Sequence, residues 1–236
     1  YDRAIHIYNS GSHGMTDMAG RIVTQYLDAI FPNLKPARVL DMGCTIGQST
    51  AAYVNRWPQA DVYAIDLGPA LLRYGHARAE ALGHKIHFSQ QSAEHTKFED
   101  GSFDVITSNI LAHETSTKAW PAIIKECHRL LSPGGIMIHA DLPQLNEVDP
   151  YRQFIYTNET HYNNEPFWTK FRTLDLKKVT VDAGFLPENV IRDFSQVKGG
   201  KDQAKIDAAI ETSRSAGHGA PPGSPLGIAF IIGIKE

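Results

Sequence analysis

The sequence is poor in cysteine and lacks both a block of basic residues and a long apolar run. Its 236 residues include two cysteines, Cys44 and Cys127, and no C-x-x-C pair, so no disulfide framework is expected. A reducing, cytoplasmic location is therefore expected. No apolar run approaches the roughly 18–20 residues that a membrane-spanning helix needs, so we expect no membrane partner. The chain begins at Tyr1 rather than methionine, and we expect a leading segment before it.

Charge and histidine spacing argue against two further classes of partner. The formal net charge is −3 with neutral histidines, and lysine and arginine are scattered along the chain. Proteins that hold nucleic acid usually concentrate positive charge on one face, so we expect no nucleic-acid partner. No H-x-H or H-x-x-x-H pair occurs, and we expect no metal site. The expected partner is a small molecule, bound by a monomer or a homodimer.

Short apolar stretches alternate with stretches of helical spacing over most of the chain. This alternation predicts an α/β fold, in which a mostly parallel sheet carries helices on both faces. The predicted strands are residues 37–42, 61–66, 85–90, 103–108, 136–140, 190–197 and 228–235. The predicted helices are residues 16–31, 48–57, 69–82, 118–131 and 171–183.

We interpret the whole chain as one domain, in which a core carries three appendages. The core spans residues 37–141. Residues 1–36 form an N-terminal lid and a helix, and residues 142–170 form a polar, aromatic insert. Residues 171–236 hold a C-terminal helix and the final strand pair. A long excursion at 198–225 separates these two strands, and such excursions are often functional.

The clearest chemical signal is the glycine turn at residues 39–47, which follows the first predicted strand of the core. Gly43 and Gly47 have no Cβ, so the backbone can approach a ligand closely. Asp41 ends the strand, where its carboxylate can meet a ligand's ammonium group. In an open α/β sheet, ligands bind beyond the carboxyl ends of the strands. The turn therefore predicts a ligand site, although glycine after a strand also serves turns that bind nothing.

Asp66 narrows the class of ligand. It ends the next strand, about 20 residues after the turn, where an acid can accept hydrogen bonds from the hydroxyl groups of a ribose. The turn lacks the G-x-G-x-x-G pattern that cradles a pyrophosphate, so a nucleoside without phosphates fits better than a dinucleotide. A nicotinamide-dependent oxidoreductase stays as the less favoured alternative.

Five motifs in order between residues 37 and 141 resemble the class I S-adenosylmethionine-dependent methyltransferases of the small-molecule type. They are LDMGCTIG, VYAID, QQSAEHTKFEDGSFDVI, SNILAHE and RLLSPGGIMIHAD. In the first motif Thr45 replaces the family's middle glycine, and in the third Ser92 replaces its adenine-contacting aspartate. The resemblance implies a doubly wound, Rossmann-like, seven-stranded sheet whose last strand is antiparallel, with helical and loop lid insertions.

The resemblance also implies roles for individual residues around S-adenosylmethionine and its product, S-adenosylhomocysteine. The glycine turn would pass the methionine part, the second strand end would hold ribose and flank adenine, and the third motif would border adenine. The implied cofactor-binding residues are Asp41, Gly43, Cys44, Gly47, Asp66, Leu67, Ser92, Ala93 and Asn109.

His113 and Glu114 are the candidate catalytic residues. Both follow the fourth strand of the core, where this family places substrate-facing residues, and histidine can titrate near neutral pH. His113 is the candidate general base, and Glu114 could orient it or act itself. The alternative is a histidine that caps a helix or packs in the core.

Polar and aromatic side chains of the appendages are the candidate substrate contacts. Long inserts beside a pocket often form lids, although the same side chains could simply pack on the surface. The candidates are Tyr8, His13, Tyr162, Asn164 and Trp168. The sequence thus predicts an enzyme that methylates oxygen, nitrogen or carbon of a small metabolite. The second hypothesis is a module that binds the cofactor or its product without methyl transfer.

Overall fold

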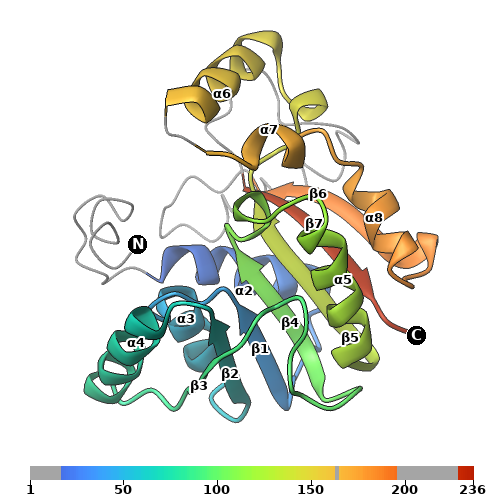
Figure 1. Cartoon of the computed structure of the whole chain (residues 1–236). Coiled ribbons are helices and arrows are strands. Elements are labelled where there is room, and N and C mark those ends of the chain that lie inside the picture. Colours follow the sequence, from blue (N-terminus) through green and yellow to red (C-terminus); the bar gives the residue numbers. More distant parts are fainter. Residues whose placement is uncertain (1–16, 163–164, 196–227) are drawn as a thin grey trace.

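The computed structural model describes residues 17–162, 165–195 and 228–236 (Figure 1). The expectations for Tyr8, His13, Asn164 and the excursion at 198–225 lie outside these residues. Among the described residues, no helix combines the length and the apolar character that crossing a bilayer requires.

A seven-stranded sheet forms the centre of the described part of the chain. Its strand order is β3-β2-β1-β4-β5-β7-β6, and β7 runs antiparallel to both of its neighbours while the other pairs are parallel. This confirms the predicted mostly parallel α/β sheet. The strands are β1 (Arg38–Met42), β2 (Asp61–Asp66), β3 (His87–Gln90), β4 (Phe103–Asn109), β5 (Leu131–Asp141), β6 (Val190–Ser195) and β7 (Ile228–Ile234).

Helices cover both faces of the sheet, as Figure 1 shows. One face carries α2, α3 and α4, and the other carries α5 and α8. The segment from α6 to α7 lies beyond one end of the strands. The helices are α2 (Met18–Ile30), α3 (Gln48–Arg56), α4 (Pro69–Ala81), α5 (Ala119–Leu130), α6 (Pro150–Tyr162), α7 (Trp168–Phe171) and α8 (Leu176–Asp182), with short 3₁₀ turns η1 (Ala112–Glu114), η2 (Leu145–Glu147) and η3 (Pro187–Asn189).

Strand β1 shows why the sheet needs helices on both faces. Successive side chains of a strand point to opposite faces. Val39 therefore joins the apolar cluster under α2 and α3, while Leu40 and Met42 join the cluster under α5 and α8. All three are fully buried. A parallel strand that is buried on both sides has a nearly continuous apolar sequence, which is the signal that predicted this strand.

The part of the chain that follows the core differs from the prediction in two places. The predicted continuous helix at 171–183 is wrong, because the chain forms α7 and α8 with a turn between them. Asp175 caps α8 by accepting a hydrogen bond from the backbone N–H of Lys178 at 2.9 Å, so a new helix begins there. The insert at 142–170 contains α6, a helix that the sequence reading did not separate from the loop around it.

The loops that follow β1 and β4 meet at one end of the sheet. The strand order reverses between these strands, because β2 follows β1 on one side and β4 lies on the other. A Cβ atom added to Gly43 would approach the Cδ1 atom of Leu111 to 2.9 Å. In doubly wound sheets, the crevice beyond the strand ends at such a reversal is where ligands bind.

His139, a residue of β5, is buried near this end of the sheet. The His139 Nδ1 atom lies 2.6 Å from Ser108 Oγ, its Nε2 atom lies 3.6 Å from Cys127 Sγ, and its ring meets Trp120 edge to face. Burial lowers the pKa of His139 to about 3, and the charge of Asp141 opposes this shift only in part. The imidazole is therefore neutral in the folded protein.

We predict that His139 makes the protein less stable in mild acid. In the unfolded chain His139 binds a proton near pH 6.5, whereas in the folded chain it does not. The contribution of the neutral imidazole to the free energy of unfolding is therefore fully present above pH 6.5 and is lost as the pH falls toward 3. The loss reaches at most about 1.4 kcal/mol per pH unit. Urea unfolding of the wild type and His139→Gln between pH 7 and 4 measures the difference. Parallel pH profiles for the two proteins would contradict the prediction.

Candidate functional site

The glycine turn after β1 adopts an unusual backbone. Gly43, Thr45 and Gly47 have φ angles of 71°, 50° and 72°, and Gly47 is the N-cap of α3. Glycine takes such angles without strain, whereas a β-branched residue such as Thr45 is an outlier there. The N–H groups of Gly43 and Cys44 donate to the carbonyl of Ile65 at 2.8 and 3.0 Å, which fixes the turn against β2.

Cys44 contributes to this turn through its backbone. Its side chain is buried against Ala64 and Leu72, on the side of the turn that faces the sheet and α4. Burial raises the pKa of its thiol, and the charges of Asp41 and Asp66 add to this effect. The thiol is thus a neutral, inert part of the core.

Asp66 links the ends of β1 and β2 through a single carboxylate. Its two oxygens accept hydrogen bonds from the N–H groups of Thr45 at 2.9 Å and Gly68 at 2.8 Å. Each carboxylate oxygen has two acceptor positions, so the partly exposed group can accept further bonds. The adjacent Leu67 is 66% exposed. A carboxylate beside an exposed apolar side chain suits a ribose beside a flat base.

The loop that carries Ser92 and Ala93 follows β3 beside this carboxylate. The N–H of Gln91 donates to the backbone carbonyl of Asp66 at 3.2 Å, so the loop begins next to the strand end. Ser92 Oγ accepts from the N–H of Glu94, and Ala93 packs against the core. Both predicted adenine neighbours therefore lie in a loop adjoining Asp66.

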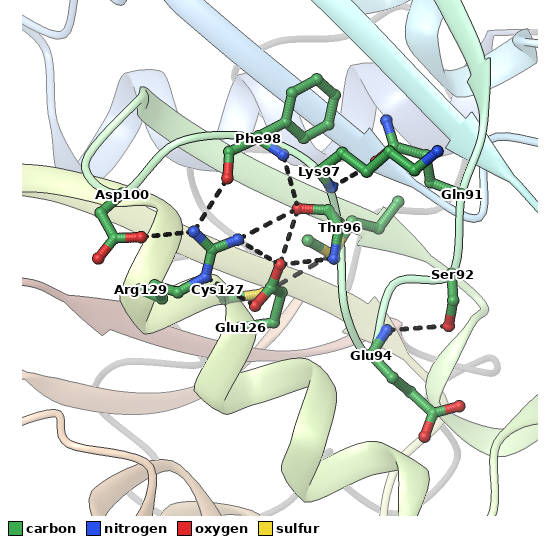
Figure 2. A network of polar contacts seen from close by, with 11 residues as sticks. Gln91, Ser92, Glu94, Thr96, Lys97, Phe98, Asp100, Glu126, Cys127 and Arg129 are labelled. Atoms are coloured by element: carbon green, nitrogen blue, oxygen red, sulfur yellow. Dashed lines mark hydrogen bonds and ion pairs between the residues drawn. The ribbon is translucent and has the colours of Figure 1, made fainter.

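A polar network fixes the far half of this loop to α5, as Figure 2 shows. Glu126 accepts from both the N–H and the hydroxyl of Thr96 at 2.7 Å. Arg129 donates to Glu126, to the carbonyl of Phe98 and to Asp100. Hydrogen bonds from Arg129 and Thr96 lower the pKa of Glu126, although its burial opposes them. The ionised network holds this half of the loop in place against α5.

Asp41 lies deeper than a group that touches a ligand directly. It is 1% exposed and accepts a hydrogen bond from Thr50 Oγ1 at 2.5 Å. Burial raises the pKa of Asp41 to about 7, with a smaller contribution from the charge of Asp66, while the Thr50 bond opposes the rise. Burial therefore favours the protonated carboxyl group much more than in an exposed aspartate.

Asn109 ends β4 and donates from Nδ2 to Tyr53 Oη at 2.8 Å. The next residue, Ile110, has a φ angle of 57°, is 38% exposed and donates its N–H to the carbonyl of Ala140 at 2.8 Å. A β-branched residue at positive φ costs about 1–3 kcal/mol and occurs mostly at functional sites. The strained backbone turns the chain sharply from β4 into η1.

His113 lies in η1, directly after this turn, and is held by Asp141 at the end of β5. The distance from His113 Nδ1 to Asp141 Oδ1 is 2.7 Å. Asp141 also accepts from the N–H groups of Ala112 at 2.9 Å, His113 at 3.3 Å and Leu142 at 2.7 Å. His113 was a candidate from the sequence and Asp141 was not, although an acid at the end of a predicted strand was a usable signal.

Aromatic side chains of the insert cover His113. The Trp168 ring meets the imidazole edge to face, with ring centres 5.2 Å apart. The guanidinium of Arg172 lies 4.8 Å from the Trp168 ring centre and 3.7 Å from that of Tyr156 in α6. This row of contacts connects α6 to His113, which is only 4% exposed.

Two glutamates add negative charge near His113. Its Nε2 atom lies 3.9 Å from Glu114 Oε1, and Glu165 interacts electrostatically with both residues. Burial lowers the pKa of His113, but Asp141, Glu114 and Glu165 outweigh it, so the net shift is upward. Burial and the charge of Glu114 raise the pKa of Glu165. Glu165 belongs to the polar, aromatic insert in which the sequence predicts substrate contacts.

The structure brings some of the other predicted residues together and leaves others apart. Trp168 is at the site, whereas Tyr162 is 80% exposed at the end of α6 and makes its ring contact with His161. Within the described residues, no group of three histidine, cysteine or acidic side chains is arranged to hold a metal ion.

Known proteins match both the sequence and the fold. The methyltransferase-domain family matches residues 39–135. An uncharacterized methyltransferase of Synechocystis is 33% identical over 160 residues, which cover 66% of this chain and 69% of that protein. A demethylmenaquinone methyltransferase of Thermus thermophilus is 30% identical over 108 residues, or 46% of this chain. The chain spans about half the length of several such relatives, including 48% of this one.

A solved structure shares the fold along most of the chain. A protein of Galdieria sulphuraria, described as a putative sarcosine dimethylglycine methyltransferase, aligns with a TM-score of 0.61 at 15% identity and covers 91% of this chain and 84% of that one. Fold, motif order and sequence identity agree with one another. The chain belongs to the class I methyltransferases, whose cofactor is S-adenosylmethionine.

Proposed function

We propose that the protein transfers a methyl group from S-adenosylmethionine to a small-molecule acceptor, with His113 as general base. The observation that carries the proposal is the position of the His113–Asp141 pair. It lies at the ends of β4 and β5, and the adjoining Leu111 contacts the glycine turn of β1. A titratable group thus lies beside a nucleoside-type site.

The residues around the turn fit the cofactor. Asp66 offers acceptors for ribose hydroxyls, and exposed Leu67 offers an apolar surface for adenine. Ser92 and Ala93 would border the base, and the backbone of Gly43, Cys44 and Gly47 would pass the methionine part. Asn109 and buried Asp41 would act near its amino group, Asp41 through a water molecule or a neighbouring residue. When bound, the cofactor supplies a methyl group that its sulfonium already activates.

A general base matters only when the acceptor arrives with a proton on the attacking atom. His113 would take that proton on Nε2, since Nδ1 is engaged with Asp141. A hydroxyl-bearing acceptor fits this arrangement best. The relative named as a demethylmenaquinone methyltransferase supports an organic metabolite as the acceptor.

The insert around α6 and α7 is the proposed lid. Trp168 packs edge to face on the His113 ring, and His113 is only 4% exposed, so the insert would have to move for an acceptor to reach Nε2. Closure would then exclude water from the transfer. Glu114 faces the same nitrogen and would orient the acceptor. We also propose that the protein is cytoplasmic, that it is a monomer or a homodimer, and that it has no nucleic-acid partner.

Replacing Asp66 should weaken cofactor binding. Asp66→Asn removes a charged acceptor, and we expect a 10- to 100-fold rise in the Kd for S-adenosylmethionine and S-adenosylhomocysteine, measured by calorimetry. Asp61→Asn, at the exposed start of the same strand, is the matched control and should leave both values unchanged. Tight binding of NAD without binding of either adenosyl compound would overturn the proposal.

Replacing Asp41 should have opposite effects on stability and binding. Because its folded pKa lies near 7, the carboxyl stabilises the fold below pH 4, and this contribution is lost as the pH rises through 7. Asp41→Asn should gain up to roughly 4 kcal/mol relative to the wild type between pH 4 and 8. Urea unfolding measures the gain, and calorimetry should show weaker cofactor binding. An unchanged difference across pH would contradict the assignment.

Replacing His113 should slow the reaction without loosening the cofactor. Labelled S-adenosylmethionine and a metabolite extract first identify the methylated product. On that acceptor, His113→Gln should lower kcat by roughly 10²–10⁴-fold and leave the cofactor Kd unchanged. His76→Gln, an exposed histidine on α4, is the control. Unchanged turnover of His113→Gln at every pH would remove the base from the mechanism. Cofactor binding without any methylated product would favour a binding module.

A further inference from the structure

We propose that Asp141 is the positioning residue for His113: its carboxylate holds the imidazole with the proton on Nδ1 and the lone pair on Nε2. The inference deepens the proposed function, since it assigns the residue that prepares the base. The carboxylate ends β5 and lies across from η1, so residues separated by 28 positions in the chain form one unit.

The two oxygens of the Asp141 carboxylate make different contacts. One oxygen, Oδ2, accepts from the backbone N–H groups of Ala112 and His113, which fixes the turn that carries the imidazole. The other oxygen, Oδ1, accepts from the Leu142 N–H and lies 2.7 Å from Nδ1 of the ring. Since an ionised carboxylate can only accept, the ring nitrogen facing it must carry the proton.

The rest of the surroundings keeps the ring in this orientation. Trp168 meets the imidazole edge to face, and the Phe171 ring centre lies 6.4 Å away. The strained φ angle of Ile110 turns the chain so that the η1 amides point at Asp141. Rotating the ring by 180° would put Cδ2 in the place of Nδ1 and break the charge-assisted hydrogen bond to Asp141, so the ring is fixed from two sides.

Charges from three elements act on this imidazole. Asp141 reaches it from β5, Glu114 from η1, and Glu165 from the segment before α7, while the guanidinium of Arg172 lies behind Trp168. The acids raise the pKa of His113 and Asp141 makes the largest of these contributions. At a pH below that pKa the base is blocked by its own proton. Asp141 thereby also sets the pH above which the base can act.

The test follows His113 directly by NMR of the full chain labelled with ¹⁵N-histidine, and His113→Gln identifies its signals. In the wild type we expect the neutral ring to carry its proton on Nδ1. In Asp141→Asn the titration midpoint should fall by about 1–2 pH units. Glu114→Gln removes one charge but no backbone contact, and should shift the midpoint by less than about half a unit.

Several outcomes separate the inference from the proposed function. A neutral wild-type ring with its proton on Nε2 overturns the inference, and this measurement needs no variant. An unchanged His113 midpoint in folded Asp141→Asn overturns the inference as well. If Asp141→Asn does not fold, Asp141→Glu takes its place in the experiment. A midpoint and a tautomer in Asp141→Glu identical to those of the wild type would then overturn the inference. If NMR shows the expected tautomer and shift while His113→Gln keeps full turnover, Asp141 positions His113 but the base role fails. If both hold, Asp141→Asn lowers kcat with little change in KM, and the acid limb of its pH profile moves to lower pH.

Discussion

A carboxylate at the end of a parallel strand, bonded to groups of the next loop, is the interaction on which this site depends. Asp66 accepts from the N–H groups of Thr45 and Gly68, and Asp141 accepts from three N–H groups and faces His113. Asp41, near the end of β1, accepts from the Thr50 hydroxyl of helix α3. Parallel strands bring their carboxyl ends to one edge, so these acids gather the loops there. The sheet thus fixes the glycine turn and His113 relative to each other.

The proximity of Asp66 to the glycine turn could be predicted from local sequence, whereas the pairing of His113 with Asp141 could not. Asp66 and the glycine turn belong to one strand–turn–helix–strand unit, so their spacing is visible in the chain. The His113–Asp141 pair depends instead on the register between β4 and β5, which local pattern does not specify. The break between α7 and α8 arose from a cap at Asp175, whose effect competes with an apolar spacing that runs through it.

Burial and pairing decide the charge state of two histidines near one carboxylate. His139 and Asp141 lie on the same face of β5, and His139 bonds to neutral partners, so burial keeps it uncharged. His113 is also buried but contacts the carboxylate directly, and the paired charge outweighs burial. Asp141 thus lies near one histidine that burial keeps neutral and contacts another whose pKa it raises. The charge state of neither histidine could be predicted from its residue type alone.

The row of Tyr156, Arg172, Trp168 and His113 has a consequence for how such enzymes diversify. Each planar group contacts the next one in the row. A substitution in α6 would therefore alter the position of the imidazole without touching the glycine turn or Asp66. Under the proposed function, the acceptor side of the site would therefore change through one helix, while the residues around the glycine turn stay the same.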